Sequence, residues 1–443
     1  MIRLHCKVQT YEWGKKGLDN LVAQAYLNQV PSIPESAELF DQAKEDTYAE
    51  LWIGDHTNGP SQIIVDTHDE QLKAIINDQE FIHAHHGKEI SIDRLFELNP
   101  LKFLGQAYLE QIGSNDAQFA TKSSLLFKVL CIRKALSIQA HPNKSLAQQL
   151  HASHPEIYKD PNHKPEMAIA LGGSEDFISY CGFAPAEVMM KNLKENPVLL
   201  EIFGPLCTNE QISSENLKDL VKVMFYKLDK DPEQLAIIIT NLQNHILQIG
   251  EEERSLHQQL SLRLIEQYGY KDIGIIFTFF LNAIVLKEGE CIALMPDEPH
   301  AYVQGDIMEC MFTSDNVVRG GLTPKLKDVD TLVSMLKYEN MNLPVLVKPN
   351  MPIQDSVWEY KSGFKEFRVF KILLGQKDQS VELKFNSFSF GFVVQGEGSI
   401  EMEEYGNFKL DQYNAYYIMP EKQFKIQNVG ESPFLMFIAN CDL

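Results

Sequence analysis

The chain has 443 residues, 44% of them hydrophobic, which allows about three domains with well-packed cores. Forty Lys and Arg against 61 Asp and Glu give a net charge of −21, which argues against nucleic acid or an anionic membrane as the main partner. The seven cysteines form no CxxC pair, and neither a signal peptide nor a membrane-spanning apolar run is found. We therefore expect a soluble protein of the reducing cytoplasm.

The first clear β pattern lies between residues 120 and 170. The segments LLFKVLCI (125–132) and LSIQAHP (136–142) predict two short strands separated by a turn. Alternate side chains of a strand share a face, so Ser137, Gln139 and His141 are expected on one side. A hydroxyl, an amide and an imidazole on one face make this strand a candidate binding site.

A helical pattern replaces the β pattern over residues 184–271. Apolar residues recur there at the helical period in two groups, Leu217, Leu220, Val221 and Met224, then Leu235, Ile238, Ile239 and Leu242. Asp231 followed by Pro232 predicts the start of the second helix, with Asp as N-cap and Pro at the first helical position.

The β pattern then returns and continues to the C-terminus. In FSFGFVVQGEGSIEM (388–402), Gly396 and Gly398 indicate a turn between two strands, and Pro420 ends a third strand. The sequence predicts a mainly β fold of two cupin or jelly-roll barrels with an α-helical insertion.

We assign three domains to this pattern. Residues 1–172 and 272–340 are expected to form a catalytic cupin domain, 173–271 a helical insertion domain, and 341–443 a C-terminal cupin-like barrel. His300 is the last histidine of the chain, so the C-terminal barrel is predicted to lack a histidine metal site.

Four residues from three segments are candidate metal ligands: Gln139, His141, Glu166 and His300. Two imidazoles, one carboxylate and one amide oxygen suit a divalent cation, and the absence of thiolates argues against a closed structural zinc site. With one anionic ligand the centre would stay positive and could stabilise a developing oxyanion. The HAHH segment (83–86) lies in polar sequence without a partner motif and is interpreted as a surface feature.

Five segments together resemble one family. They are YEWG (11–14), AELWIGDHTNGPS (49–61), LLFKVLCIRKALSIQAHPNKSLA (125–147), HKPEMAIAL (163–171) and EPHAYVQGDIMECMFTSDNVVRGGLTPKLKDV (298–329). In this order, over roughly the first three-quarters of the chain, they resemble type I phosphomannose isomerases. The resemblance implies a monomeric cupin enzyme with one Zn²⁺ per chain. It would interconvert mannose 6-phosphate and fructose 6-phosphate through a cis-enediol and feed mannose and GDP-mannose metabolism.

The resemblance also implies roles for individual residues. The zinc ligands of the family fall on Gln139, His141, Glu166 and His300. The catalytic group comprises Arg319 at the reacting carbons, Lys164 and His163 for acid–base work and ring opening, and Glu309 and Asp315 nearby. Lys164 can be the base only if its pKa is depressed, because an ordinary Lys is protonated at pH 7.

Phosphate recognition is expected from Ser137, Lys128 and Lys325.

The residues alone leave two other functions open. A cupin oxygenase would bind iron through two His and one carboxylate. Gln139 as a fourth ligand argues against this function. A non-enzymatic sugar-phosphate sensor would keep the metal and phosphate contacts without a working base.

Overall fold

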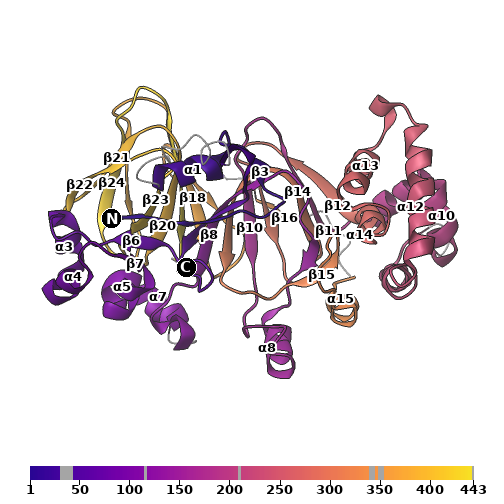
Figure 1. Cartoon of the computed structure of the whole chain (residues 1–443), viewed down its shortest axis with the longest axis horizontal. Coiled ribbons are helices and arrows are strands. Elements are labelled where there is room, and N and C mark those ends of the chain that lie inside the picture. The colour runs from indigo at the N-terminus through magenta and orange to yellow at the C-terminus, as the bar shows by residue number, and fades with distance from the viewer. Residues whose placement is uncertain (30–42, 114–116, 208–210, 339–344, 348–353, 442–443) are drawn as a thin grey trace.

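The structure is a computed structural model that describes residues 1–29, 43–113, 117–207, 211–338, 345–347 and 354–441. Antiparallel sheets fill the middle and one end of an elongated molecule, and a cluster of helices forms the other end (Figure 1). Among the helices of the described ranges, none is long and apolar enough to cross a membrane.

The largest sheet contains most of the motif segments of the sequence. Its eleven strands are β2 (Lys7–Gln9), β5 (Glu50–Gly54), β8 (Leu125–Ile132), β9 (Ile138–Ala140), β10 (Glu166–Ala170), β11 (Phe177–Phe183), β12 (Leu281–Leu286), β13 (Cys291–Leu294), β14 (His300–Phe312), β15 (Val318–Gly321) and β16 (Val345–Val347). Strand β14 is the hub, because it pairs with β8, β9, β10 and β11. The predicted strand at 125–132 is confirmed as β8.

A glycine in β14 changes which side chains share a face. Gly305 has a φ of 106°, and a Cβ at this position would lie 2.7 Å from the Cα of Phe177. Before this residue β14 pairs with β9 and β11, and after it with β8 and β10. In a regular strand, Tyr302 and Glu309 would lie on opposite faces, because their residue numbers differ by an odd number. The irregularity at Gly305 brings both side chains to the same face, where the Tyr302 hydroxyl donates to Glu309 Oε1 at 2.7 Å.

Two further sheets are built mostly from the C-terminal region of the chain. The six-stranded sheet contains β1 (Ile2–Leu4), β17 (Val357–Tyr360), β18 (Arg368–Leu374), β20 (Ser389–Gln395), β23 (Ala415–Ile418) and β25 (Phe434–Asn440). The four-stranded sheet contains β19 (Ser380–Lys384), β21 (Gly398–Met402), β22 (Gly406–Leu410) and β24 (Gln423–Asn428). The predicted turn at Gly396 is confirmed between β20 and β21, with a φ of 80°. Two small ribbons pair β3 (Lys15–Lys16) with β4 (Thr47–Tyr48) and β6 (Gln62–Ile64) with β7 (Glu89–Ser91).

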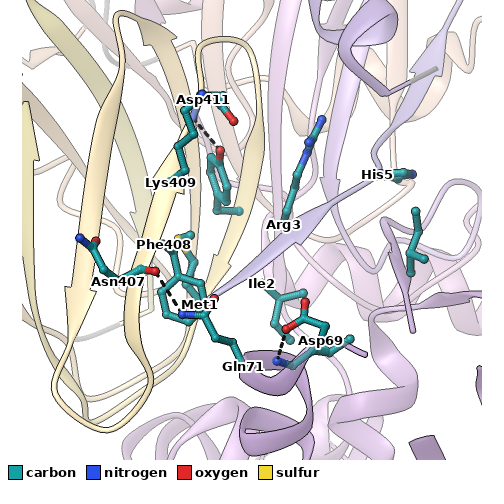
Figure 2. A pocket seen from close by; sticks show the side chains of 13 residues that line it. Met1, Ile2, Arg3, His5, Asp69, Gln71, Asn407, Phe408, Lys409 and Asp411 are labelled. Carbon is teal, nitrogen blue, oxygen red and sulfur yellow. Dashed lines mark hydrogen bonds and ion pairs between the residues drawn. The ribbon is translucent and has the colours of Figure 1, made fainter. Parts of the chain in front are cut away.

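The N-terminal strand belongs to the C-terminal sheet. Ile2 of β1 pairs with Tyr417 of β23, at the edge of the six-stranded sheet. A hollow of about 440 Å³ lies beside this strand, where Gln71 donates to the carbonyl of Asn407 (Figure 2). Residues from both ends of the chain therefore share one structural unit.

Helices from the first quarter of the chain cover this C-terminal sheet. They are α3 (Glu70–Ile76), α4 (Gln79–His85), α5 (Asp93–Leu98), α6 (Pro100–Leu104) and α7 (Gln106–Tyr108). Phe96 and Phe103 contact Tyr417, at 5.8 Å and 6.5 Å between ring centroids, and their cluster includes residues of all three large sheets. The remaining helices of the β region are α1 (Leu21–Gln29), α8 (Lys144–Ser153) and α15 (Val329–Met335).

The helical end of the molecule has a second core. It contains α9 (Ala186–Lys194), α10 (Pro197–Phe203), α11 (Ser214–Val223), α12 (Pro232–Leu247), α13 (Leu256–Tyr268) and α14 (Gly274–Phe277). The predicted start of α12 is confirmed, since Asp231 accepts from the Gln234 amide with Pro232 at the first helical position. Residues 177–183, inside the predicted helical range 173–271, instead form β11 of the large sheet.

The expectation of a mainly β chain is confirmed only in part. The sheets are antiparallel as expected, but helices contribute about as much of the chain as strands do. The additional helical content comes largely from α3–α7. The sequence pattern predicts a β domain for the N-terminal part of the chain and does not predict these helices. The division into three domains stays a prediction.

Candidate metal centre

Three buried side chains converge on one point of the large sheet. Glu166 Oε2 lies 3.3 Å from His141 Nε2 and 3.4 Å from His300 Nε2, and each side chain is at most 2% exposed. Within the described ranges, this is the one group of His, Cys, Asp or Glu residues whose ligand atoms all lie within 4.8 Å of one another. Three of the four predicted ligands are thus brought together.

Hydrogen bonds at the far side of each imidazole orient it toward this point. His141 Nδ1 lies 2.7 Å from the carbonyl oxygen of Asn316, and His300 Nδ1 lies 3.3 Å from that of Glu298. Because a carbonyl can only accept, Nδ1 carries the proton in both rings and Nε2 offers a lone pair. Burial lowers the pKa of His141 to about 4, so the ring is neutral near pH 7.

The three converging atoms have no hydrogen-bond partner among the described residues. His141 Nε2, His300 Nε2 and Glu166 Oε2 are all buried and unsatisfied, which is costly unless something else binds them. Two imidazole nitrogens and a carboxylate oxygen are the donors that a divalent transition metal prefers. The residues present therefore fit a metal ion.

The second oxygen of Glu166 faces a lysine. Lys164 Nζ lies 3.2 Å from Glu166 Oε1, with the lysine side chain 11% exposed. Burial opposes ionisation of Glu166, but the charge of the nearby Lys164 ammonium favours it, and the pKa of Glu166 lies well below the usual range. The carboxylate is therefore available as an anionic ligand.

Gln139 reaches the same region from β9. Its backbone pairs with His300 of β14 on one side and with Arg319 of β15 on the other, and its side chain lines the adjoining cavity. The strand pairing therefore puts Gln139 next to His300 in the sheet.

A cavity of about 750 Å³ opens beside the convergence point. Nine of the predicted site residues line it: Ser137, Gln139, Lys128, Lys164, Glu166, Glu309, Asp315, Arg319 and Lys325. Trp13 and Trp52 also line it, while His141 and His300 are not among its lining residues. A pocket in which many polar groups converge between apolar and aromatic walls suits a small polar molecule.

Lys128 is enclosed by carboxylates. Its Nζ lies 3.2 Å from Glu309 Oε2, 3.5 Å from Glu50 Oε2 and 5.2 Å from the centre of the Trp52 ring. Burial alone would lower the pKa of Lys128, but the charges of Glu50, Glu309 and Glu166 raise it above its ordinary value. The expected phosphate ligand is thus already paired inside the protein.

Glu309 is a carboxylate with an unusual environment. It accepts from the Tyr302 hydroxyl and contacts Lys128, yet burial raises its pKa above the ordinary value. A carboxyl group with a raised pKa inside a polar pocket is a candidate for proton transfer.

Three charged residues that line the cavity come from the segment after β14: Asp315, Arg319 and Lys325. Arg319 is half-buried, burial lowers its pKa, and its guanidinium forms no ion pair within the part of the chain that the structure describes. Asp315 Oδ1 lies 3.2 Å from His56 Nε2, and this hydrogen bond lowers the pKa of Asp315. Lys325 is exposed at the cavity edge.

His163 points elsewhere. Its Nε2 lies 2.8 Å from Glu366 Oε1, its ring stacks on Phe312, and it is not among the residues lining the cavity. The structure therefore does not bring this predicted catalytic residue to the others.

Some pocket residues were not singled out from the sequence. Glu50 accepts from Trp52 Nε1 at 2.6 Å and faces Lys128, and Tyr302 binds Glu309. Glu50 could have been found from the sequence, because it is a carboxylate within the otherwise apolar strand ELWIG, and buried carboxylates are rare. The HAHH segment covers the end of helix α4 and its C-cap, where His83 and His86 are exposed, as the interpretation of a surface feature predicts.

Comparison with known proteins gives a consistent result. Residues 1–186 match the family model described as phosphomannose isomerase type I, catalytic domain. The chain is 34% identical over 440 residues to mannose-6-phosphate isomerase 2 of Arabidopsis thaliana, covering 97% of this chain and 91% of that one. It is 33% identical to mannose-6-phosphate isomerase of Candida albicans, covering 96% and 94%.

Solved structures agree in fold. A mannose 6-phosphate isomerase bound with zinc and yttrium matches with a TM-score of 0.76 and 25% identity, covering 100% of both chains. A mutant of phosphomannose isomerase from Salmonella typhimurium matches with a TM-score of 0.77 and 24% identity, also over 100% of both chains. Because the relatives from Arabidopsis thaliana and Candida albicans share 34% and 33% of their aligned residues with it over nearly their whole length, this chain belongs to the type I phosphomannose isomerase family.

Proposed function

We propose that this chain interconverts mannose 6-phosphate and fructose 6-phosphate, with one zinc ion as its cofactor. The observation that carries the proposal is the group of three buried ligand atoms on His141, Glu166 and His300, without partners among the described residues, beside a polar cavity. The relatives that share the family are named for this reaction, and one solved relative binds zinc.

The proposed zinc ligands are His141, Glu166, His300 and Gln139. When bound, zinc supplies a positive charge that polarises the oxygens of a sugar. Both imidazoles are already in the tautomer that offers Nε2, and Glu166 is ionised, so the protein holds its ligands ready for the cation.

An aldose–ketose isomerisation moves a proton between C2 and C1 of the open-chain sugar through a cis-enediol. Glu309 is the base that the environment favours, since its carboxyl faces the cavity and its pKa is raised by burial. Lys164, which lies 3.2 Å from Glu166 and lines the cavity, is the second candidate. Arg319, whose guanidinium pairs with no carboxylate of the described ranges, offers its charge to the negative charge that develops on the sugar oxygens.

Phosphate recognition is proposed for Ser137 and Lys325, which lie on the lining of the cavity. Lys128 is removed from this role, because its ammonium already has two carboxylate partners in a buried site. We assign it instead to holding Glu50 and Glu309 in place. Asp315 is proposed to fix the cavity wall through His56.

Finer features of the fold are also proposed. A cupin or jelly-roll type arrangement of both β regions is supported by their antiparallel pairing and by the four-stranded and six-stranded sheets that share one core. A helical insertion is supported by the separate core of α9–α14. A cytoplasmic monomer that supplies mannose and GDP-mannose metabolism is proposed, with the lack of disulfides among the seven cysteines, all of which are described, as support for a reducing compartment.

The test is a coupled assay that measures fructose 6-phosphate formation from mannose 6-phosphate. Activity should disappear with a chelator and return with added zinc, and Gln139→Leu or Glu166→Ala should lose zinc and activity together. Zinc-loaded protein that binds the sugar phosphate but never converts it would favour a sensor. Oxygen consumption with iron-loaded protein would favour an oxygenase.

A further inference from the structure

Two loops behind the candidate metal centre are tied together by one carboxylate. Asp160 lies in the loop before β10, and residues 314–316 form the loop that follows β14. Asp160 Oδ1 accepts from the Ser314 hydroxyl at 2.8 Å, and Asp160 Oδ2 accepts from the Asp315 amide at 2.8 Å. We propose that Asp160 is a positioning residue for the metal centre, an inference that rests on the proposed function.

The third contact of Asp160 leads to a metal ligand. The side-chain amide of Asn316 donates to the carbonyl of Asp160 at 2.7 Å and to its Oδ1 at 3.3 Å. The carbonyl of the same Asn316 accepts from His141 Nδ1 at 2.7 Å. Asp160 therefore fixes the peptide group that sets the tautomer and the orientation of His141.

The surrounding residues make this arrangement rigid. Asn162, fully buried, accepts from Asn316 Nδ2 at 2.9 Å and from the Ser314 hydroxyl at 3.1 Å through its carbonyl. Its side-chain oxygen accepts from Lys144 Nζ at 2.7 Å. Asn316 is also fully buried, so its amide cannot exchange these partners for water without opening the loop.

The same loop carries Asp315 into the cavity. The Asp315 amide is held by Asp160, while its carboxylate faces His56. One carboxylate thus places both an imidazole at the ion and a carboxylate on the cavity wall. Outer hydrogen bonds of this kind typically change metal affinity by about 10-fold to 100-fold when removed.

The test compares zinc affinity in three variants, measured by chelator competition on the full chain. Asp160→Asn keeps the shape but replaces one acceptor oxygen with an NH₂ group that cannot accept from Ser314 or Asp315. Asn316→Ala keeps the carbonyl that binds His141 and removes the side-chain amide that donates to Asp160 and to the carbonyl of Asn162. Asp328→Asn is the matched control, since Asp328 also accepts from a hydroxyl, that of Tyr158, and caps α15 without touching the 314–316 loop.

We expect Asp160→Asn and Asn316→Ala to bind zinc about 10-fold more weakly, with thermal melting of the zinc-free protein close to that of wild type and Asp328→Asn unchanged in affinity. Unchanged zinc affinity in Asp160→Asn would overturn the proposal. If Asp160→Asn does not fold, Asn316→Ala decides in the same way. Wild-type protein that binds zinc tightly but does not isomerise the sugar would overturn the proposed function and leave this inference standing, whereas wild-type protein that binds no zinc would overturn both.

Discussion

His163 Nε2 lies 2.8 Å from Glu366 Oε1, and this contact joins the segment that carries Glu166 to the loop between β17 and β18. The His163 ring stacks on Phe312 at 5.4 Å between centroids. The imidazole is therefore held by residues of the C-terminal third of the chain and is not among the residues that line the cavity.

Replacing Glu366 with Gln should destabilise the protein in a pH-dependent way. The contact with His163 lowers the pKa of Glu366, so its stabilisation is present above the ordinary carboxyl pKa and is lost as the pH falls through the lower folded value. We expect about 1 kcal/mol at pH 7 and less at pH 3, measured by denaturant unfolding. Turnover should change little.

The control for this variant is Glu404→Gln. Glu404 pairs with Lys422 at 2.7 Å on the surface, with the Glu404 side chain 58% exposed, and should contribute less. A large fall in turnover for Glu366→Gln at unchanged stability would instead return His163 to the catalytic group.

Lys128→Met tests whether this lysine serves Glu309 or the phosphate. Removing the ammonium should raise the pKa of Glu309 further, so the low-pH limb of kcat/KM should move to higher pH. Leaving two buried carboxylates without a cation should also cost about 3–5 kcal/mol of stability, measured by denaturant unfolding.

Tyr302→Phe is the companion variant, because it removes only the hydroxyl that binds Glu309 and should move the same limb by less. A rise in KM for mannose 6-phosphate with an unshifted pH profile would contradict the assignment and restore Lys128 to phosphate binding.

Arg319→Lys should keep zinc and lose most of its turnover. The half-buried guanidinium has no ion-pair partner in the described ranges and lines the cavity, so its planar set of N–H donors is available to the reacting sugar. A lysine ammonium would keep the charge but not this donor geometry. We expect kcat to fall about 100-fold with KM little changed, measured with metal content in the same samples. Arg94→Lys, which affects a surface pair with Glu97, is the control and should behave as wild type. Normal turnover in Arg319→Lys would remove this arginine from the reaction.

Asp55→Asn should change how stability depends on pH. Asp55 is buried behind β5, where both of its oxygens accept from Ser123, and burial raises its pKa from 3.8 to about 6. The folded state then holds the proton more tightly than the unfolded state, so stability falls as the pH rises from about 4 to about 6.

The raised pKa of Asp55 lowers the free energy of unfolding by about 3 kcal/mol at pH 7, compared with its value at a pH below both pKa values. The variant keeps an acceptor for the Ser123 amide and can donate to its hydroxyl, so its unfolding free energy should lack this decline. The measurement is denaturant unfolding at several pH values between 4 and 7. Parallel pH curves for the two proteins would contradict the prediction.

The sequence predicts the local elements of the site better than its assembly. Strand β8, the cap of α12 and three converging ligands follow from periodicity, turn chemistry and the family motifs. The meeting of Tyr302 and Glu309 does not, because simple alternation along β14 would put them on opposite faces. The irregularity at Gly305 decides this, and it depends on the close approach of Phe177 from another strand.

Contacts between residues far apart in the chain could not be predicted from the sequence either. Nothing local in Phe96 or Phe103 indicates that they contact Tyr417, which lies close to the opposite end of the chain. The contact of His163 with Glu366 could not be predicted either, since Glu366 comes from the distant C-terminal region. Motifs report which side chains gather, whereas the direction in which each one turns depends on residues far away.

The pairing of Ile2 with Tyr417 has a consequence for biosynthesis. During translation β1 leaves the ribosome long before its partner β23 has been made. Such a non-local pairing is slow to form and leaves a bare strand edge in the meantime. A premature stop upstream of β23 would make that exposure permanent, so nonsense truncations that spare every residue of the zinc site should still yield aggregation-prone protein.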